Sequence, residues 1–283
     1  MDRSMVICGE WDTRKRAEAY RQVLGSERVS TVAEPCKISD MHALIDIRGD
    51  MEDKRRIPTW QERGAFIIAD DPPAATLEES QAIMACGGIL LARPSYYDHR
   101  YELLRQQISD DQIEKLVAVR MIRLWPEDSW LSDGVTLDYG FDAFDALCSL
   151  LGGVKRIMAR EQRLKRDKPD TLLAIVAGEN DAIGYLELCT CHPQGYQSER
   201  IEVIGHKGIL EYNSDVNRTL RVNTGQRVCM RDAFREPPLS RMVREYLNLV
   251  DDDRAVRAHA AATRRSLHLV YRALKSSRQN RPA

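Results

Sequence analysis

The chain has 283 residues, of which 43% are hydrophobic and 30% are charged, a composition typical of a globular protein with room for two domains. Its 42 Lys and Arg residues balance 43 Asp and Glu residues, so the formal net charge is -1. This balance excludes the overall basic field on which non-specific nucleic-acid binding depends. No apolar run approaches the ~20 residues that a membrane helix needs.

The amino terminus and the cysteines bear on the compartment. Residues 1–8 lack the long apolar segment and the small-residue cleavage site of a signal peptide. The seven cysteines are an odd number without framework spacing, which favours reduced thiols. We therefore expect a cytoplasmic protein with no membrane association.

The first third of the chain alternates short apolar runs with helical patterns. Buried strands are predicted at residues 4–8, 29–33, 42–47, 64–69 and 89–92. A capping box, in which a Thr is followed three residues later by a Glu, opens a helix at Thr76. Strands that alternate with helices in this way predict a parallel sheet. We expect a reduced Rossmann-like domain over residues 1–95, with about five strands.

After a predicted helix at residues 97–108, strand-like segments follow one another with few helical patterns between them. Residues 96–283 are expected to form an α+β domain built on a mostly antiparallel open sheet. Its predicted strands cover residues 112–123, 154–163, 171–177, 182–191, 199–204, 209–212 and 219–222. Its predicted helices cover residues 141–151, 241–250 and 255–276.

The most informative motif lies in residues 135–145. Asp138, Gly140 and Asp145 match a D-x-G-x-H-x-x-D pattern, and Asp142 stands where that pattern has histidine. The segment resembles the signature of the Gfo/Idh/MocA oxidoreductases, two-domain nicotinamide enzymes that act mostly on sugars and polyols. In that family the histidine is a candidate for proton transfer beside the substrate, so the resemblance implies the fold more directly than the activity.

Three further segments are similar to the same family, in the expected order. Residues 67–79 resemble a strand, an E-K-P motif and a helix that begins T-x-E-E. Residues 205–210 resemble a G-x-x-G-x-[LI] turn, and residues 267–278 resemble the terminal helix. Family members commonly associate through the open face of the second sheet, so the resemblance also implies a homo-oligomer.

The turn after the first strand departs from the family's G-x-G-x-x-G cofactor motif. Residues 9–14 retain only Gly9 of the three glycines, and Trp11 places a large ring where close backbone approach is needed. The resemblance implies NAD or NADP bound by Gly9, Trp11, Thr13 and Arg14. Two carboxylates in the same turn disfavour a bound pyrophosphate, although Arg14 could compensate. The alternative is a strand–turn–helix that binds no phosphate.

The family's catalytic positions are also changed. Asp71 replaces the E-K-P lysine, whose ammonium group can polarise a reacting hydroxyl or carbonyl group. Asp142 replaces the histidine, but a carboxylate can also serve as a general base. Asp71, Asp142 and Asp145 are the catalytic candidates, and Asp138, Arg93 and Tyr97 are candidates for the substrate cleft. We expect ordinary hydride transfer on a sugar or polyol to be impaired or lost.

Two interpretations of the aspartates remain open. Asp71, Asp138, Asp142 and Asp145 could surround the cleft and bind a cationic ligand, either an amine or a hard divalent metal. Alternatively, Asp138 and Asp145 make capping or inter-domain hydrogen bonds, and Asp142 is solvated. No metal is assigned.

Two classes of function follow from these motifs. The chain is either a divergent oxidoreductase with Asp142 as acid or base, or a non-catalytic protein that binds a small molecule or a partner.

Cys189, Cys191 and His192 suggest zinc, but no second Cys/His pair has finger spacing, which favours packed thiols.

Overall fold

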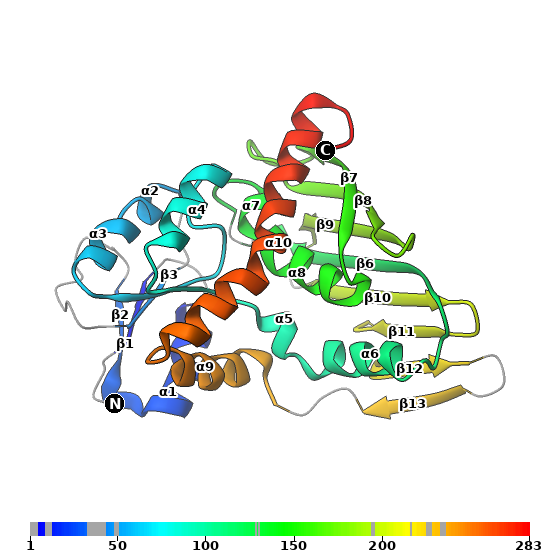
Figure 1. Ribbon diagram of the computed structural model, residues 1–283, viewed down its shortest axis with the longest axis horizontal. Helices are drawn as coiled ribbons and strands as arrows, with labels where there is room; N and C mark the ends of the chain where they lie inside the picture. The colour runs from blue at the N-terminus through cyan, green and yellow to red at the C-terminus, as the bar shows by residue number, and fades with distance from the viewer. Residues whose placement is uncertain are drawn as a thin grey trace. The chain divides into compact units, whose positions relative to one another are not determined.

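The computed structural model describes residues 5–8, 13–32, 44–47, 51–127, 129, 131–193, 196–215, 217–224, 228–232 and 236–283. The chain divides into two compact units (Figure 1). The first unit comprises residues 1–94 and 237–267, and the second comprises residues 95–236 and 268–283. One unit holds a parallel sheet and the other a mostly antiparallel sheet, so the predicted fold class is confirmed.

The first unit contains a five-stranded sheet in the order β2-β1-β3-β4-β5, in which all described pairs are parallel. Its strands are β1 (Met5–Cys8), β2 (Val29–Val32), β3 (Leu44–Ile47), β4 (Phe66–Ala69) and β5 (Ile89–Leu91). Every residue of β1, β3, β4 and β5 is buried, as expected for a parallel sheet with both faces covered. The five predicted strands are thus confirmed.

The helices of this unit come from two separate parts of the chain. They are α1 (Thr13–Leu24), η1 (Ser26–Arg28), α2 (Met51–Lys54), α3 (Ile57–Glu62), α4 (Leu77–Ala85), α9 (Pro238–Leu249) and the first part of α10 (Asp253–Gln279). Thr76 caps α4, because its hydroxyl accepts a bond from Glu79 N at 3.3 Å and donates to Glu79 Oε2 at 2.9 Å. The predicted helix start with Thr76 as N-cap is confirmed, and Glu79 closes the motif through the Thr76 hydroxyl instead of the backbone N–H group of a capping box.

Two side chains from the returning segment bond to the end of β5. The carbonyl oxygen of Leu91 accepts from the Tyr246 hydroxyl at 2.7 Å and lies 3.0 Å from His259 Nε2. The Tyr246 and His259 rings meet edge to face, with 5.2 Å between centroids. Burial, followed by the charge of Arg93, lowers the pKa of His259 to about 4.

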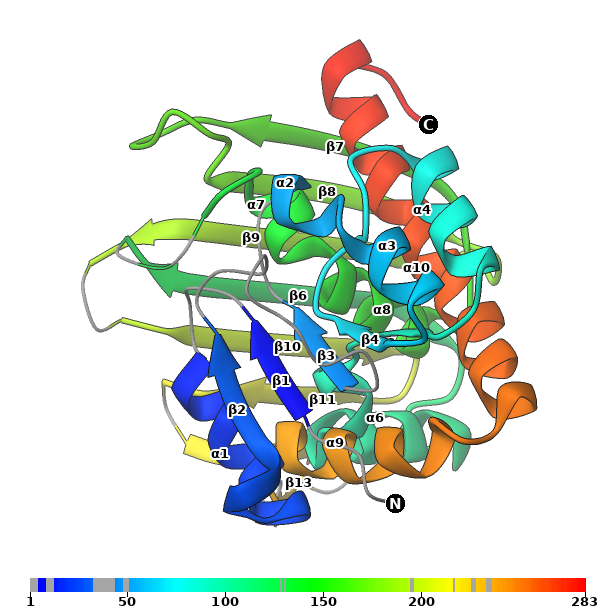
Figure 2. The same cartoon turned by 90° about the vertical axis from the view of Figure 1, so that its left-hand side faces the viewer.

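The second unit contains an eight-stranded sheet in the order β13-β12-β11-β10-β6-β9-β8-β7 (Figure 2). β6 and β9 are parallel, and the other described pairs are antiparallel. The strands are β6 (Leu116–Pro126), β7 (Val154–Gln162), β8 (Thr171–Gly178), β9 (Ile183–His192), β10 (Ser198–Gly205), β11 (Ile209–Asn213), β12 (Asn217–Asn223) and β13 (Val228–Asp232). The prediction started β6 four residues too early and missed β13.

The helices of the second unit are α5 (Pro94–Tyr97), α6 (His99–Ser109), α7 (Val135–Asp138), α8 (Gly140–Leu151) and the end of α10. α6 begins two residues later than predicted because Asp98 is its N-cap and accepts from Arg100 N at 2.8 Å. α8 packs on β6 and β9. The sheet's opposite face leaves Met158, Leu173, Ile175 and Ile183 between 42% and 56% exposed.

The turn between β10 and β11 requires glycine at its first position. Gly205 N donates to Gly208 O at 2.9 Å, which closes the turn predicted at residues 205–210. A Cβ atom on Gly205 would lie 2.2 Å from the backbone oxygen of Ile113. Any side chain at this position would therefore displace the chain that enters β6. None of the helices in the described part of the chain combines the length and the apolar character needed to cross a membrane.

The buried His259 gives a prediction for the pH dependence of stability. Its pKa in the folded state is about 4, below the ordinary 6.5, so the unfolded state binds more protons. We expect stability to fall by ~3 kcal/mol as the pH drops from 6.5 to 4. His259→Gln should remove this loss, which urea unfolding at a series of pH values measures.

Tyr246→Phe is the matched control, because it removes a bond to the same carbonyl without removing a group that titrates in this range. It should lower stability by a similar amount at each pH. Equal slopes for the wild type and His259→Gln between pH 6.5 and 4 would contradict the prediction.

Candidate functional site

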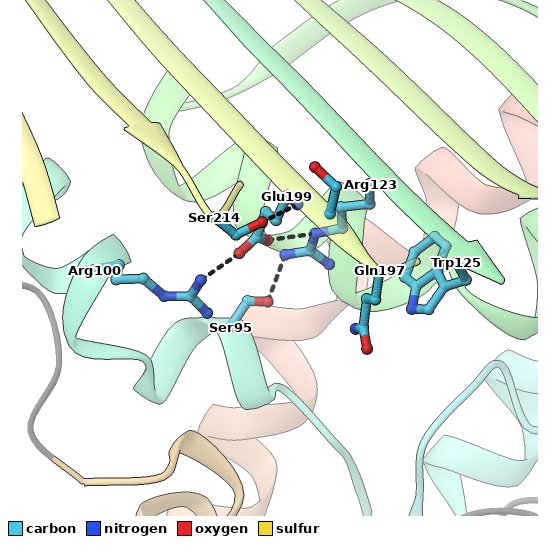
Figure 3. A pocket seen from close by; sticks show the side chains of 8 residues that line it. Ser95, Arg100, Arg123, Trp125, Gln197, Glu199 and Ser214 are labelled. Carbon is cyan, nitrogen blue, oxygen red and sulfur yellow. Dashed lines mark hydrogen bonds and ion pairs between the residues drawn. The ribbon is translucent and has the colours of Figure 1, made fainter. Parts of the chain in front are cut away.

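A pocket of about 320 Å³ lies in the second unit. Figure 3 shows the side chains around it, which come from α5, α6, β6, β10 and the segments beside β10 and β11. The lining residues are Ser95, Arg100, Arg123, Trp125, Gln197, Ser198, Glu199 and Ser214. Most of these side chains are polar or charged, so the pocket is suited to a hydrophilic ligand.

The pairing of β6 with β10 creates the charged wall of this pocket. Arg123 lies opposite Glu199 in the strand register. Both side chains point to the covered face of the sheet, because each lies two residues from a buried residue of its own strand, Met121 or Ile201, and therefore shares its face. A cation and an anion therefore enter the interior side of the sheet together.

Arg123 is the centre of a hydrogen-bond network, with only 8% of its side chain exposed. Its Nε donates to Glu199 Oε1 at 2.9 Å, and its Nη1 donates to Asp142 Oδ2 at 2.8 Å. Its Nη2 donates to Ser95 Oγ and to the Tyr101 hydroxyl, each at 2.6 Å. Each terminal or bridging nitrogen of this guanidinium thus has a partner within the protein.

Arg100 is the second cation of the network. Its Nη1 donates to Glu199 Oε2 at 2.6 Å, while Nε and Nη2 bond to the carboxylate of Asp98. The guanidinium also lies 4.7 Å from the centroid of the Tyr212 ring, a cation–π distance. Arg100, like Arg123, is engaged at every nitrogen.

The charges in this network determine the protonation of its members. Burial alone would raise the pKa of the Glu199 carboxyl, but Arg100 and Arg123 outweigh it and lower that pKa. Burial also raises the pKa of Tyr101 well above its usual value, so the phenol remains a neutral donor. Because the pKa of Glu199 is lowered, its contribution to stability is present at neutral pH and is lost as the pH falls through that value.

Asp142, at the family's histidine position, is held by this network. Its Oδ1 accepts from Ser95 N at 2.9 Å, and its Oδ2 accepts from Ser95 Oγ at 2.5 Å and from Arg123. Its side chain is 19% exposed. The structure therefore shows an ion-paired Asp142, which neither the cationic-ligand hypothesis nor a solvated carboxylate had described.

The neighbouring aspartates have different surroundings. Asp138 Oδ2 accepts from the backbone N–H groups of residues 132, 133 and 134 at 2.8, 3.0 and 3.2 Å, which fixes the loop before α7. Asp145 lies buried within α8. Among the described residues no three His, Cys, Asp or Glu side chains gather as a metal site would require. The geometry therefore does not support the hypothesis that the aspartates bind a divalent metal.

The candidates in the first unit are described separately. Asp71 is buried, and Lys54 Nζ lies 3.4 Å from its Oδ2. Lys54 therefore compensates for the carboxylate that stands at the E-K-P lysine position. Arg93 is 9% exposed, and its backbone N lies 3.3 Å from Met242 Sδ. Tyr97, in the second unit, is half-buried with its ring 5.3 Å from that of Tyr96.

The predicted cofactor-binding turn is only partly described. Gly9 and Trp11 lie outside the described residues, α1 begins at Thr13, and Arg14 is exposed. One turn further along α1, the buried Arg16 pairs with Asp46 and lies 3.5 Å from Asp70 Oδ2. The Tyr20 hydroxyl also bonds to Asp46. The charge of Arg16 is therefore already engaged by carboxylates of the protein.

Sequence reasoning missed several residues of the pocket, although a signal was present. Arg123 follows Val119 and Met121 at every second position, so the three share one face of a strand. Glu199 shares a face with Ile201 and Val203 in the same way. A charge in phase with the apolar face of a strand indicates a buried, paired group. Ser95, Trp125 and Gln197 carry no comparable signal.

Residues 101–211 match the family model described as the GFO/IDH/MocA C-terminal domain. This segment contains most of the pocket and the whole of the Arg123 network except Ser95, Asp98 and Arg100. These residues are therefore similar to the C-terminal domain of the GFO/IDH/MocA family. The Gfo/Idh/MocA resemblance predicted from the motif at residues 135–145 is therefore confirmed.

Solved structures of Gfo/Idh/MocA type share the fold over the full chain. An inositol dehydrogenase homolog from Azotobacter vinelandii, complexed with NADH and myo-inositol, is 14% identical with a TM-score of 0.77, covering 99% of this chain and 97% of its own. An oxidoreductase from Pseudomonas syringae is 13% identical with a TM-score of 0.77, covering 99% and 98%. An oxidoreductase from Agrobacterium radiobacter, in complex with NAD+, L-tartaric acid and magnesium, is 14% identical with a TM-score of 0.70, covering 99% and 90%. No curated protein sequence matches the chain.

The Arg123 network gives a stability prediction. Arg123→Met leaves Glu199 and Asp142 without their shared cation, so we expect a loss of ~3–5 kcal/mol in the free energy of unfolding. Arg120→Met is the matched control on the same strand, because its pair with Glu202 is 60% and 44% exposed. That change should cost less than ~1 kcal/mol in urea unfolding. Equal losses in the two variants would contradict the assignment of Arg123 as the centre of the network.

Proposed function

We propose that this Gfo/Idh/MocA-type protein binds an uncharged sugar or polyol in the pocket of its second unit, and that ordinary nicotinamide-dependent hydride transfer is impaired. The observation that carries the proposal is the engagement of Asp142 by Ser95 and Arg123. This engagement bears on whether Asp142 can act as a general base and on the charge of the ligand that the pocket can accept.

A general base must present a free lone pair within hydrogen-bond reach of the proton that it removes. A carboxylate has about four such positions, and protein donors occupy three of those on Asp142. The ammonium group of Lys54 is likewise engaged by Asp71. Both positions from which the family would supply acid–base or electrostatic catalysis are therefore already partnered.

The same network favours an uncharged ligand. Two guanidiniums, those of Arg100 and Arg123, face three carboxylates, those of Asp98, Asp142 and Glu199. Every guanidinium nitrogen already donates to a protein group, so both cations are compensated within the protein. An anionic ligand would add charge to a cluster with a surplus of negative groups.

The remaining groups of the pocket suit hydroxyl groups and C–H surfaces. Figure 3 shows no bond from Gln197 or Trp125 to another lining residue, so the amide and the indole face the pocket without such a partner. Trp125 is packed on Tyr139, with ring centroids 4.4 Å apart, which fixes its orientation. An aromatic ring with a few polar groups is typical of a small-molecule site. Myo-inositol in one structural neighbour is consistent with this class.

NAD or NADP remains the cofactor that the family suggests, and structural neighbours are complexed with NAD+ or NADH. Arg16 would be the nearest buried cation to the start of α1, but Asp46 and Asp70 engage it. The exposed cations at this end of the helix are Arg14 and Lys15, and ion pairs of exposed groups contribute little. We therefore propose that any nucleotide binds weakly, on the order of millimolar, where a pyrophosphate would gain only about 4 kcal/mol.

Calorimetry with the purified chain tests the ligand class. We expect myo-inositol to bind and L-tartrate to give no heat, because a dianion would add charge to a cluster in which three carboxylates already face two guanidiniums. Gln197→Ala should weaken the binding of myo-inositol by about tenfold through the loss of one hydrogen bond. Gln112→Ala, an exposed glutamine outside this pocket, is the control. Binding of tartrate in preference to neutral polyols would overturn the charge argument.

Thermal unfolding with NAD(H) and NADP(H) tests the impairment separately. A ligand that binds only the native state raises the melting temperature as its excess over the dissociation constant grows. We expect little shift below millimolar nucleotide. A large shift at micromolar nucleotide, together with reduction of NAD+ by a polyol, would refute the proposed impairment.

We also propose that a second copy of the chain covers the open face of the eight-stranded sheet. Met158 and Ile175 lie opposite each other on β7 and β8 and are 52% and 56% exposed. Exposed apolar patches of this kind mark protein interfaces. We predict a dimer or larger oligomer by light scattering, which Ile175→Lys should dissociate. Leu164→Lys, at a 62% exposed position outside the strands, should not, and a monomeric wild type would contradict the proposal.

A further inference from the structure

Two cysteines on β9 lie close enough to react with each other. The Sγ atoms of Cys189 and Cys191 are 2.9 Å apart, and both residues are free thiols. A disulfide bond is ~2.04 Å long, so the two sulfurs lie within about 1 Å of bonding distance. The pair is not used by the ligand pocket.

An irregularity in β9 explains this approach. Leu124 pairs with Cys189 and Pro126 pairs with His192, so β9 advances three residues where β6 advances two. Such a bulge bends the strand locally. In a regular strand, residues two apart have Cα atoms about 6.6–6.8 Å apart, at the limit that a disulfide tolerates. The bulge therefore supplies the closer approach that two thiols of a C-x-C segment need.

The surroundings favour thiol chemistry over metal binding. The hydroxyl of Thr171 contacts both thiols, with Oγ1 at 3.4 Å from Cys189 Sγ and 3.7 Å from Cys191 Sγ. No cluster of three potential metal ligands occurs within the described ranges, so the thiols have no third ligand there. Cys189 is 6% exposed, whereas Cys191 is half-buried and more accessible.

We propose that Cys189 and Cys191 are a redox-active pair that closes to an intrastrand disulfide by exchange with a small-molecule disulfide. The Cys191 thiolate attacks one sulfur of glutathione disulfide and releases one glutathione thiolate. The Cys189 sulfur then attacks Cys191 in the mixed disulfide and releases the second glutathione. Two thiols are oxidised, one disulfide is reduced, and two protons pass to the departing glutathiones.

The experiment equilibrates the full-length chain with mixtures of oxidised and reduced glutathione, followed by acid quench, alkylation, trypsin digestion and mass spectrometry. The peptide of residues 167–200 contains both thiols and no other cysteine. Under excess glutathione disulfide it should lose both alkyl labels and be lighter by two hydrogen atoms, and dithiothreitol should reverse the change. Burial raises the pKa of Cys191 to about 11, so the exchange is followed until it stops changing.

Three comparisons make the outcome decisive. Cys189→Ser and Cys191→Ser should each give a mixed disulfide with glutathione or no reaction, and never the internal link. In urea the equilibrium constant for ring closure should fall by at least about tenfold, because the fold supplies the proximity. Exposed Cys86 serves as an internal reporter that the oxidant is active. The proposal fails if Cys86 reacts while the 167–200 peptide keeps both labels, or if closure is as favourable in urea as in the folded chain.

Discussion

Burial of the Arg123 guanidinium is the constraint around which the second unit is arranged. A cation with 8% of its side chain exposed must be compensated, since an unpaired buried charge costs several kcal/mol. Glu199 on the neighbouring strand, Asp142 on α8 and Ser95 on α5 each supply part of that compensation. Tyr101 on α6 also accepts from this group, so one guanidinium joins the sheet to three helices and fixes the wall of the pocket.

This arrangement connects stability to chemistry. A carboxylate that compensates a buried cation has few lone pairs left for a substrate, and we therefore propose that Asp142 serves the structure where a family histidine would serve catalysis. Lys54 and Asp71 repeat the pattern in the first unit, because a lysine from α2 pairs with the carboxylate at the E-K-P position. The sequence alone suggested that the positive charge of the family's lysine is replaced by a negative charge at Asp71. The structure adds that the ammonium group of Lys54 offsets this negative charge.

The sequence predicted elements better than partnerships. The alternation of apolar runs with helical patterns was sufficient for the five parallel strands, and the Thr76 capping box marked the start of α4. The strand β13 was missed because its pattern, Val-Cys-Met-Arg-Asp, is short and weakly alternating. Residues 237–267 return to the first unit, where Tyr246 and His259 bond to the carbonyl oxygen of Leu91. No local sequence pattern encodes these long-range contacts. Likewise, the motif identified Asp142 as a site residue. Its ion pair with Arg123 could not be predicted, because it depends on how segments far apart in the sequence pack together.

The central claim is that Asp142 is a structural carboxylate and not a general base. The rate of NAD+-dependent oxidation of myo-inositol, compared between the wild type and Asp142→Asn at equal folded fraction, tests it most directly. The account predicts that the residual rate is unchanged, while the free energy of unfolding falls because Arg123 loses a charged partner. A loss of about hundredfold or more in rate, the size expected for removal of a general base, with unchanged stability would contradict it.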